Sequence, residues 1–389
     1  MKPGRILRRA GLLLLAGYIL WLGWRGLSFR RYAGSVPAAA AGMAAPQDFE
    51  IEGVYHLHSR FSDGHGTVDD IAAAAAGEGL DFVILTDHGS PNRETLLAAG
   101  RKDGVLILAG TEISSSRGHL VAMGFDPPDR DFSGTAELAA GEAAALGGFT
   151  VLAHPYSKTA WSWGDWAGYS GLEIQNGDAV VKRAPARTLL FAPLLLARPD
   201  AALLALVGRP RRETAAWDRW GVDRPVRGYF ASDAHFAYGA LGRLFRLHVL
   251  LDEPAAADFE AARRQVFQAL KGGLFYNAVE AAAEADGFRF WAVHSGKIVP
   301  MGGTIAVGPE RDADGPVRLI ARTPFAFAHE TRLLRAGITV ASGSGPELVF
   351  ETNDPGSYRV EVFLRERTPL GAEVPWIASN VIFFSKDRP

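Results

Sequence analysis

The stretch from Tyr55 to Gly89 constrains this chain more than any other, because strand-like apolar runs alternate there with imidazoles and acids. His56 and His58 are one residue apart, Asp63 lies in a Ser-Asp-Gly turn, and His88 closes the segment Thr-Asp-His. Side chains alternate between the two faces of a strand, so His56 and His58 are expected to point the same way. Two imidazoles on one face can reach one metal ion.

A helix is expected between the first strand of this stretch and the second. Thr67 is a suitable N-cap for a helix over Val68–Gly77, and the apolar run Phe82–Leu85 reads as a buried strand. That strand delivers Asp87 and His88 at its carboxyl end. Two parallel strands joined by a helix therefore present possible metal ligands at one edge, which is an arrangement typical of enzymes.

Composition sets broad limits on the class of protein. The chain has 389 residues, of which 48% are hydrophobic, enough for one large core and a smaller domain. Its formal net charge of −2 favours no nucleic-acid partner. It has no cysteine, which excludes disulfides and thiolate chemistry.

The N-terminus indicates a membrane segment. Basic residues flank the apolar run Ala10–Trp24, and residues 1–31 are predicted to form a single membrane anchor, followed by an Ala/Gly/Pro linker over 32–48. A cleaved signal peptide is the alternative, because the apolar run is short and small residues are frequent from Pro37 to Ala45. The basic cluster before the run predicts that the rest of the chain lies outside the cytoplasmic membrane, in the periplasm.

Residues 49–298 alternate short apolar strands with Ala-rich helices, the pattern of a parallel α/β barrel. The expected strands are Gly53–His58, Leu80–Asp87, Val105–Ile113, His119–Gly124, Phe149–His154, Gly171–Gln175, Gly228–Ser232 and Phe245–Leu251. The expected helices are Val68–Gly77, Asn92–Ala99, Ala136–Leu146, Arg187–Leu206, Glu213–Trp220 and Ala256–Lys271.

Two further segments differ from the strand–helix alternation of residues 49–298. The very apolar stretch Leu189–Val207 is interrupted by Pro193 and Arg198, so a pair of core or lid helices is expected there rather than a second membrane span. Residues 299–389 alternate apolar and polar side chains between Gly, Pro, Asn and Asp turns, which predicts a small β-sandwich-like domain without a ligand cluster.

Acids and imidazoles recur at successive predicted strand ends. Taken alone, His154 before proline reads as a core histidine and Asp63 as an ordinary turn residue. Taken together, burying so many such groups around one cavity without metal would cost several kcal/mol each. The candidate metal ligands are His56, His58, Asp63, His88, Glu112, His119, His154, Asp233 and His235.

The order His-x-His, Ser-Asp-Gly, Thr-Asp-His, Gly-Thr-Glu, His-Leu-Val-Ala-Met-Gly, Ala-His-Pro and Ser-Asp-x-His resembles the polymerase and histidinol phosphatase (PHP) superfamily. The resemblance covers about Glu50 to Leu274, and the added C-terminal β-domain looks most similar to the branch named for carbaryl hydrolase. It implies a distorted (β/α)7 barrel with two or three metal ions.

The resemblance also implies a role for each ligand. A first ion would be held by His56, His58, Glu112 and Asp233. Glu112 would bridge to a second ion, held also by His119 and His154. A third ion would be held by Asp63, His88 and His235.

These ligands offer only nitrogen and oxygen, which suits zinc, manganese or iron. Clustered ions would lower the pKa of a bridging water, so that hydroxide attacks the substrate at neutral pH. The candidate catalytic carboxylates are Glu112, Asp233 and Asp87, of which Asp87 is better placed to support a ligand than to bind an ion. Arg60 and Arg117 are candidate clamps for a small anionic substrate.

The leading hypothesis is a metal-dependent hydrolase of phosphoesters. The alternatives are a carbamate, ester or amide hydrolase with the same centre, and a non-catalytic, membrane-anchored protein that binds metal or a polymer. The tryptophan-rich segment Trp161–Trp166 follows His154 and would form either a wall of the pocket or a hydrophobic plug.

Overall fold

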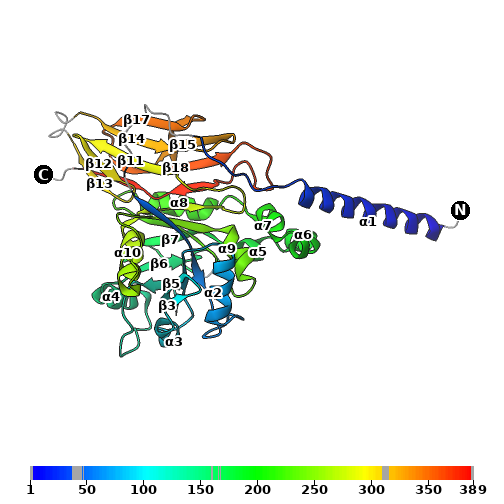
Figure 1. Ribbon diagram of the computed structural model, residues 1–389, viewed down its shortest axis with the longest axis horizontal. Helices are drawn as coiled ribbons and strands as arrows, with labels where there is room; N and C mark the ends of the chain where they lie inside the picture. Colours follow the sequence, from blue (N-terminus) through cyan, green and yellow to red (C-terminus); the bar gives the residue numbers. More distant parts are fainter. Residues whose placement is uncertain are drawn as a thin grey trace.

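The computed structural model describes residues 3–36, 46, 48–158, 161–164, 166, 168–308 and 315–386. It is a mixed α/β protein with a large sheet, an all-β region beside it, and one long helix that projects from the body (Figure 1). That helix, α1 (Pro3–Leu27), is long and apolar enough to cross a membrane, which fits an anchor or a signal sequence. Most of the expected linker, residues 37–45, lies outside the described residues.

Seven strands of the large sheet form the frame of the α/β region. Their order in the sheet follows the sequence, and every neighbouring pair is parallel except the two pairs made by β5. The strands are β1 (Phe49–Leu57), β2 (Phe82–Leu85), β4 (Val105–Ser115), β5 (Gly118–Met123), β6 (Phe149–Ala153), β7 (Gly171–Asn176) and β8 (Arg227–Ala231).

The sheet curls so that its last strand returns to its first. The Asp233 N–H donates to the carbonyl of His56, and the His58 N–H donates to the carbonyl of Ala234. Ser232 makes a further bond of this kind to Tyr55. These bonds join the carboxyl ends of β8 and β1, so the strand ends that carry the candidate ligands form a ring.

Short helices connect the strands. The capping box of Thr67 and Asp70 starts α2 (Val68–Gly77), which has the bounds expected from the sequence. The others in this region are α3 (Arg93–Leu97), α4 (Ala136–Ala145), α5 (Gly177–Arg183), α8 (Arg211–Trp220), α9 (Tyr238–Leu244) and α10 (Phe259–Gly272). The sequence reading missed α5 and α9, which are only seven residues long each.

The expectation of an all-parallel sheet was wrong at two strands. β5 is antiparallel to β4 and β6, because only Ser116 and Arg117 separate β4 from β5 and so short a turn cannot cross over. β9 (Arg246–Leu251) is antiparallel to β1 and leads away from the ring to β10 (Phe275–Ala278). A short edge strand, β3 (Gly100–Lys102), pairs antiparallel with β4.

The all-β region has two parts. One is a four-stranded sheet ordered β12 (Lys297–Pro300), β11 (Arg289–His294), β14 (Val317–Arg322) and β17 (Glu347–Thr352). The other contains β13 (Thr304–Val307), β15 (His329–Arg335), β16 (Ile338–Gly343), β18 (Gly356–Leu364), β19 (Ile377–Ser379) and β20 (Ile382–Lys386). β19 pairs with β10, so this second part continues the large sheet of the α/β region. A division at residue 298 stays a prediction.

The apolar stretch Leu189–Val207 folds as two helices, with a break at Arg198. α7 (Pro199–Leu206) is a core helix whose residues Ala201 to Leu206 are all buried. The preceding helix, α6 (Pro185–Ala197), buries only Phe191 and Leu194 among its side chains. The expected pair of helices is therefore present, and one of its members is largely exposed.

Candidate metal centre

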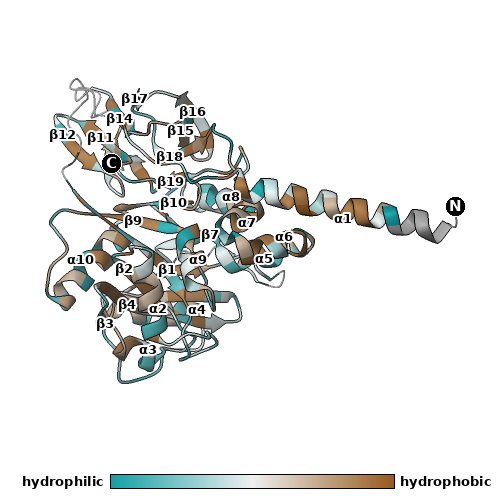
Figure 2. Cartoon of the chain, turned by 45° about the vertical axis from the view of Figure 1, so that its right-hand side comes forward, coloured by the Kyte–Doolittle hydropathy of each residue, from teal (hydrophilic) through white to brown (hydrophobic). Residues whose placement is uncertain are grey.

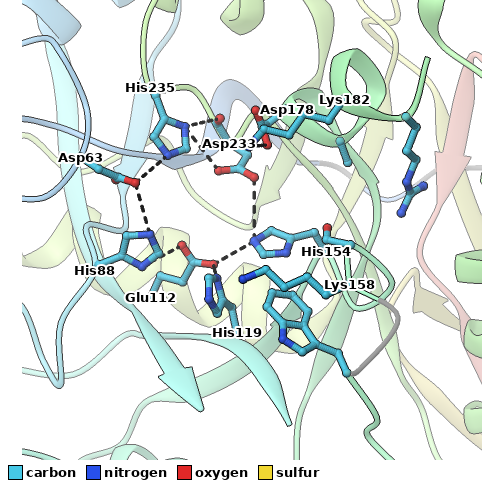
Figure 3. A pocket seen from close by; sticks show the side chains of 14 residues that line it. Asp63, His88, Glu112, His119, His154, Lys158, Asp178, Lys182, Asp233 and His235 are labelled. Atoms are coloured by element: carbon cyan, nitrogen blue, oxygen red, sulfur yellow. Dashed lines mark hydrogen bonds and ion pairs between the residues drawn. The ribbon is translucent and has the colours of Figure 1, made fainter. Parts of the chain in front are cut away.

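The nine candidate ligands lie together at the ring of carboxyl strand ends. Each contacts at least one other member through an imidazole nitrogen and a carboxylate oxygen, and Figure 3 shows those that line the pocket converging on it. Each comes from β1, β5 or the turn after a strand, except Glu112, which lies within β4. The structure thus brings together every residue predicted to hold metal, while their roles as ligands stay a prediction.

The first set of ligands has the spacing of a tetrahedral site. The Nε2 atoms of His56 and His58 are 3.1 Å apart, and Glu112 Oε2 lies 3.3 and 3.2 Å from them. Asp233 Oδ1 lies 3.5 and 3.4 Å from the same two nitrogens. Ligands about 2.0–2.1 Å from a tetrahedral zinc ion are separated by about 3.3 Å, and the five separations measured here are close to that value.

Glu112 faces two sets of imidazoles with its two oxygens. Oε2 belongs to the first set, whereas Oε1 lies 2.7 Å from His119 Nδ1 and 2.9 Å from His154 Nε2. The carboxylate is 1% exposed, so water does not compete for either oxygen. A carboxylate with one oxygen in each set is suited to bridge two ions.

Asp63 gathers a third set at the more open side of the pocket. Its Oδ2 lies 3.3 Å from His235 Nε2 and 3.6 Å from His88 Nε2. Its Oδ1 lies 3.4 Å from His58 Nδ1, and the side chain is 55% exposed. An ion in this set would be the one most accessible to solvent and substrate.

The charges of the cluster favour a cation at its centre. Burial alone would lower the pKa of His58, but its hydrogen bonds to Asp233 and Glu112 raise it to about 9. Burial would raise the pKa of Glu112, yet the imidazoles around it, led by His56, hold that pKa well below its usual value. Asp233 is held ionised in the same way, chiefly by His56 and His58.

An unpartnered nitrogen of His88 is a further sign that the site fits divalent ions. Nδ1 of His88 is buried without a hydrogen-bond partner among the described residues, and it lies 3.4 Å from Glu112 Oε2. A buried nitrogen left in this way is costly unless something binds it. A metal ion beside Glu112 would bind this nitrogen of His88.

Three of the nine residues have positive φ angles, which contradicts the simple alternation expected for the first strand. His56 has φ 68°, His154 has φ 28° and Asp233 has φ 52°. β1 changes register between Tyr55 and Leu57, so a bulge rather than regular alternation makes the imidazoles of His56 and His58 converge. Non-glycine residues with positive φ angles have a strained backbone, and such residues concentrate at functional sites.

Asp87, a candidate catalytic carboxylate, is surrounded by hydrogen-bond donors. Its carboxylate is fully buried and accepts bonds from Ser59 N–H and from the hydroxyls of Ser59, Ser62 and Thr95. Four donors use its lone pairs, so Asp87 fixes the turn that carries Asp63. This agrees with a supporting role.

Glu173 is a site residue that sequence reasoning missed. Its Oε1 lies 2.6 Å from His56 Nδ1, and its Oε2 accepts the His154 N–H and the Asn176 amide. The bond to Nδ1 leaves Nε2 of His56 free to face an ion, as partners behind metal-bound histidines do. An acidic residue inside the buried strand β7 was the available signal.

The predicted anion clamps, Arg60 and Arg117, lie outside the lining of the pocket. Arg60 donates to the carbonyl of His65, and Arg117 pairs with Glu137 at 2.5 Å; neither lines the pocket above the cluster. That pocket has a volume of about 340 Å³, and its basic residues are Lys158, Lys182 and Arg183. Lys182 and Arg183 come from α5, the helix that the sequence reading did not include.

Trp161 forms a wall of the pocket rather than a remote plug. Its ring centroid lies 4.7 Å from that of His119 and 5.4 Å from that of His154, with the latter pair stacked. Lys158 Nζ lies 5.1 Å from the same ring. Asp165, in the same predicted loop, lies outside the described residues.

A curled α/β sheet that gathers imidazoles and carboxylates at its carboxyl edge defines a protein with a candidate multinuclear metal centre. Residues 55–159 match the family model of the PHP domain. This segment of the chain is therefore similar to a PHP domain, as the motifs predict.

Three known proteins are similar to parts of the chain. A 3′,5′-nucleoside bisphosphate phosphatase from Chromobacterium violaceum is 38% identical over 80 residues, which are 19% of this chain and 28% of that protein. The chain thus aligns with well under two thirds of this relative.

Two solved structures are more distant. A two-domain protein from Bacteroides vulgatus, containing a predicted PHP-like metal-dependent phosphoesterase, is 12% identical, with 91% of this chain and 99% of that chain covered and a TM-score of 0.42. An amidohydrolase from Chromobacterium violaceum with bound sulfate is 19% identical, covering 47% of this chain and 87% of that chain at a TM-score of 0.31. Likenesses at this level carry no argument about fold or activity.

Proposed function

We propose that this protein is a metal-dependent hydrolase of small phosphoesters. The observation that carries the proposal is the convergence of His56, His58, Glu112 and Asp233, whose five measured separations are 3.1–3.5 Å. The first three of these residues lie in the segment that matches the PHP domain. The phosphatase from Chromobacterium violaceum, which is 38% identical over 80 residues, supports the same class of substrate.

The nine ligands would hold two or three divalent ions in the three sets described above. When bound, such ions lower the pKa of a coordinated water and neutralise charge on a phosphoryl oxygen. The chain's own residues would do the rest. Glu173 orients His56, Asp87 holds the turn of Asp63, and Lys158, Lys182 and Arg183 offer positive charge where a phosphate would enter.

The finer architecture is part of the proposal. Residues 49–298 would form a distorted (β/α)7 barrel, with the β8–β1 bonds as its closure, and residues 299–389 a sandwich-like domain that adds no catalytic group. α1 would be an uncleaved anchor that leaves the rest of the chain outside the cytoplasmic membrane. A reporter fused after Ala45 should then be active outside the cytoplasm, and activity confined to the cytoplasm would contradict this orientation.

The test of the activity is a turnover screen of the metal-loaded full chain in detergent. Phosphomonoesters, phosphodiesters and neutral aryl carbamates would be compared, with Glu112→Gln as the matched inactive control. We expect turnover of at least one phosphoester class that Glu112→Gln lacks. Turnover of the carbamates alone would contradict the phosphoester proposal and favour the carbamate, ester or amide alternative. No turnover by a fully metal-loaded protein would contradict the proposal that it is a hydrolase.

A further inference from the structure

The helix α6 presents a continuous apolar face to its surroundings. Leu189 is 76% exposed and Leu196 is 91% exposed. Residues three and four apart share one side of a helix, and every exposed residue in this stripe is apolar. The stripe consists of Ala186, Leu189, Leu190, Pro193, Leu196 and Ala197.

The opposite side of α6 holds the helix firmly in place. Phe191 and Leu194 are buried in the core. The one charged residue of the helix, Arg187, donates to the carbonyl of Ala205 in α7. Arg187 is exposed, but it points towards α7 and lies outside the stripe, whose side chains are all hydrocarbon. A face of this kind is unfavourable in water and marks a contact surface.

This helix lies beside the C-terminal part of α1. The Tyr18 hydroxyl donates to the Leu190 carbonyl at 2.6 Å, and the rings of Trp21 and Phe191 are 5.5 Å apart. The Arg198 guanidinium, directly after α6, donates to the carbonyl of Gly26 at 2.8 Å. Figures 1 and 2 show the two helices side by side, and Figure 2 shows hydrophobic colours on both.

The position of these contacts along α1 gives the depth of α6. Tyr18 precedes Leu27, the last residue of α1, by nine positions, which is about 14 Å along a helix. The hydrocarbon core of a bilayer is about 30 Å thick. If α1 spans the bilayer with Leu27 near its edge, the part of α6 bonded to Tyr18 falls within one leaflet.

We propose that α6 is a second membrane element, which inserts its leucine face into the leaflet on the side of the folded domain. The proposal rests on the proposed anchoring role of α1. The occupant of the apolar face is lipid hydrocarbon. A cavity of about 620 Å³ beside Leu27 lies where anionic headgroups would be, and its charged lining is four arginines and one acid: Arg30, Arg31, Arg198, Arg243 and Asp200.

This contact would also fix how the metal pocket faces the bilayer. α5 ends at Arg183 and α6 begins at Pro185, so the two helices are nearly continuous. Lys182 and Arg183 of α5 line the pocket. A membrane-bound α6 therefore holds one wall of the pocket at a set distance from the lipid surface, where a flexible tether alone would not.

The chain lacks cysteine, so single labels can test the proposal on the full protein. Leu189→Cys and Leu196→Cys would carry a fluorophore in α6. Leu97→Cys in α3, at 74% exposure, is the matched control away from α6, and Leu13→Cys in α1, also 74% exposed, reports insertion of the anchor. Each variant is reconstituted as one chain per lipid nanodisc, with bromine on the acyl chains or without it.

We expect brominated lipid to reduce the fluorescence at positions 189, 196 and 13 roughly twofold or more, and to leave position 97 unchanged. Iodide in the buffer should quench only position 97. Quenching of the α6 labels by iodide, with position 13 still quenched by lipid, would overturn the proposal and leave the anchor intact. Failure of lipid to quench position 13 would overturn the anchor and the α6 contact together.

A third result would also overturn the proposal. Labels in α6 that are shielded from both quenchers, and that transfer energy to a second labelled chain at higher loading, would show that another copy of the protein covers this face.

Discussion

The Nδ1 atom of His56 lies 2.6 Å from Oε1 of Glu173, and neither side chain is exposed to solvent. The same carboxylate accepts the backbone N–H of His154, a member of the second set of ligands. One buried carboxylate therefore fixes a residue of each of two adjacent sets. The positions of both depend on a residue that would not itself touch an ion.

Replacing Glu173 should weaken metal binding without removing a ligand. In Glu173→Gln the amide can still contact His56, but it loses the charge that favours a proton on Nδ1, and losses of such partners cost about 10–100-fold in metal affinity. Metal titration of the apo protein measures this loss. Glu137→Gln, which changes a half-exposed carboxylate paired with Arg117, is the control and should bind normally. Equal affinities for both variants would contradict the role of Glu173.

Removing a basic residue of the pocket should weaken the binding of an anionic substrate. Lys158→Ala should raise KM for a phosphomonoester about 10-fold or more, because a hydrogen bond to a charged group contributes about 1.5–3 kcal/mol. KM for a neutral substrate should change little. Arg60→Ala is the matched control, since Arg60 lies outside the pocket and donates to the carbonyl of His65. A larger effect for Arg60→Ala than for Lys158→Ala would contradict the assignment.

Asp87→Asn should loosen the turn that carries Asp63. The carboxylate accepts from two hydroxyls and one N–H within residues 59–62, and the amide group has one oxygen fewer to offer them. We expect the ion of the Asp63 set to be lost first, while the ions shared by Glu112 stay. Counting bound metal in the variant checks this order. Loss of every ion at once would show that Asp87 supports the whole cluster.

A second buried charge cluster away from the metal centre predicts a pH-dependent stability. His248 is fully buried between Glu50 and Glu280, at 2.9 and 3.1 Å. Burial would lower its pKa, but the two carboxylates raise it to about 10. His248→Phe leaves both carboxylates without this partner and should lower the free energy of unfolding by about 3–5 kcal/mol near neutral pH.

The pH dependence of the unfolding free energy distinguishes the charge contribution of His248 from its packing contribution. Because the folded-state pKa of His248 lies above its unfolded value, its contribution is complete below about pH 6.5 and is lost as the pH rises towards 10. The difference in unfolding free energy between wild type and His248→Phe should therefore shrink over that range. His65→Phe, at an exposed site, is the control with a change within about 0.5 kcal/mol. A difference that does not vary with pH would contradict the charge argument.

Much of the metal centre could be predicted from the sequence, because its ligands follow apolar strands and parallel strands end at one edge. His88, His154 and Asp233 are examples, and the whole predicted set converges. The helix α2 was predictable at both ends because Thr67 and Asp70 form a local capping box. Such features depend on residues close together in the chain.

The missed features depend on contacts between distant segments. Lys182 reaches the pocket only because α5 folds against β7, and a seven-residue helix carries little periodic signal. The positive φ angle of His56 follows from a bulge that bonds to residues after β8. The reversed direction of β5 was available in the two-residue turn before Gly118, but the alternation of strands and helices masked it.

The most direct test of the account counts metal and turnover together in wild type, Glu112→Gln and His88→Ala. Wild type should bind two or three divalent ions, because Glu112 offers one oxygen to each of two ligand sets and Asp63 gathers a third. Glu112→Gln should lose at least one ion and all turnover above background, whereas His88→Ala should keep the first set. A wild-type protein that binds at most one ion, or a Glu112→Gln variant with full metal content and near wild-type turnover, would contradict the central claim.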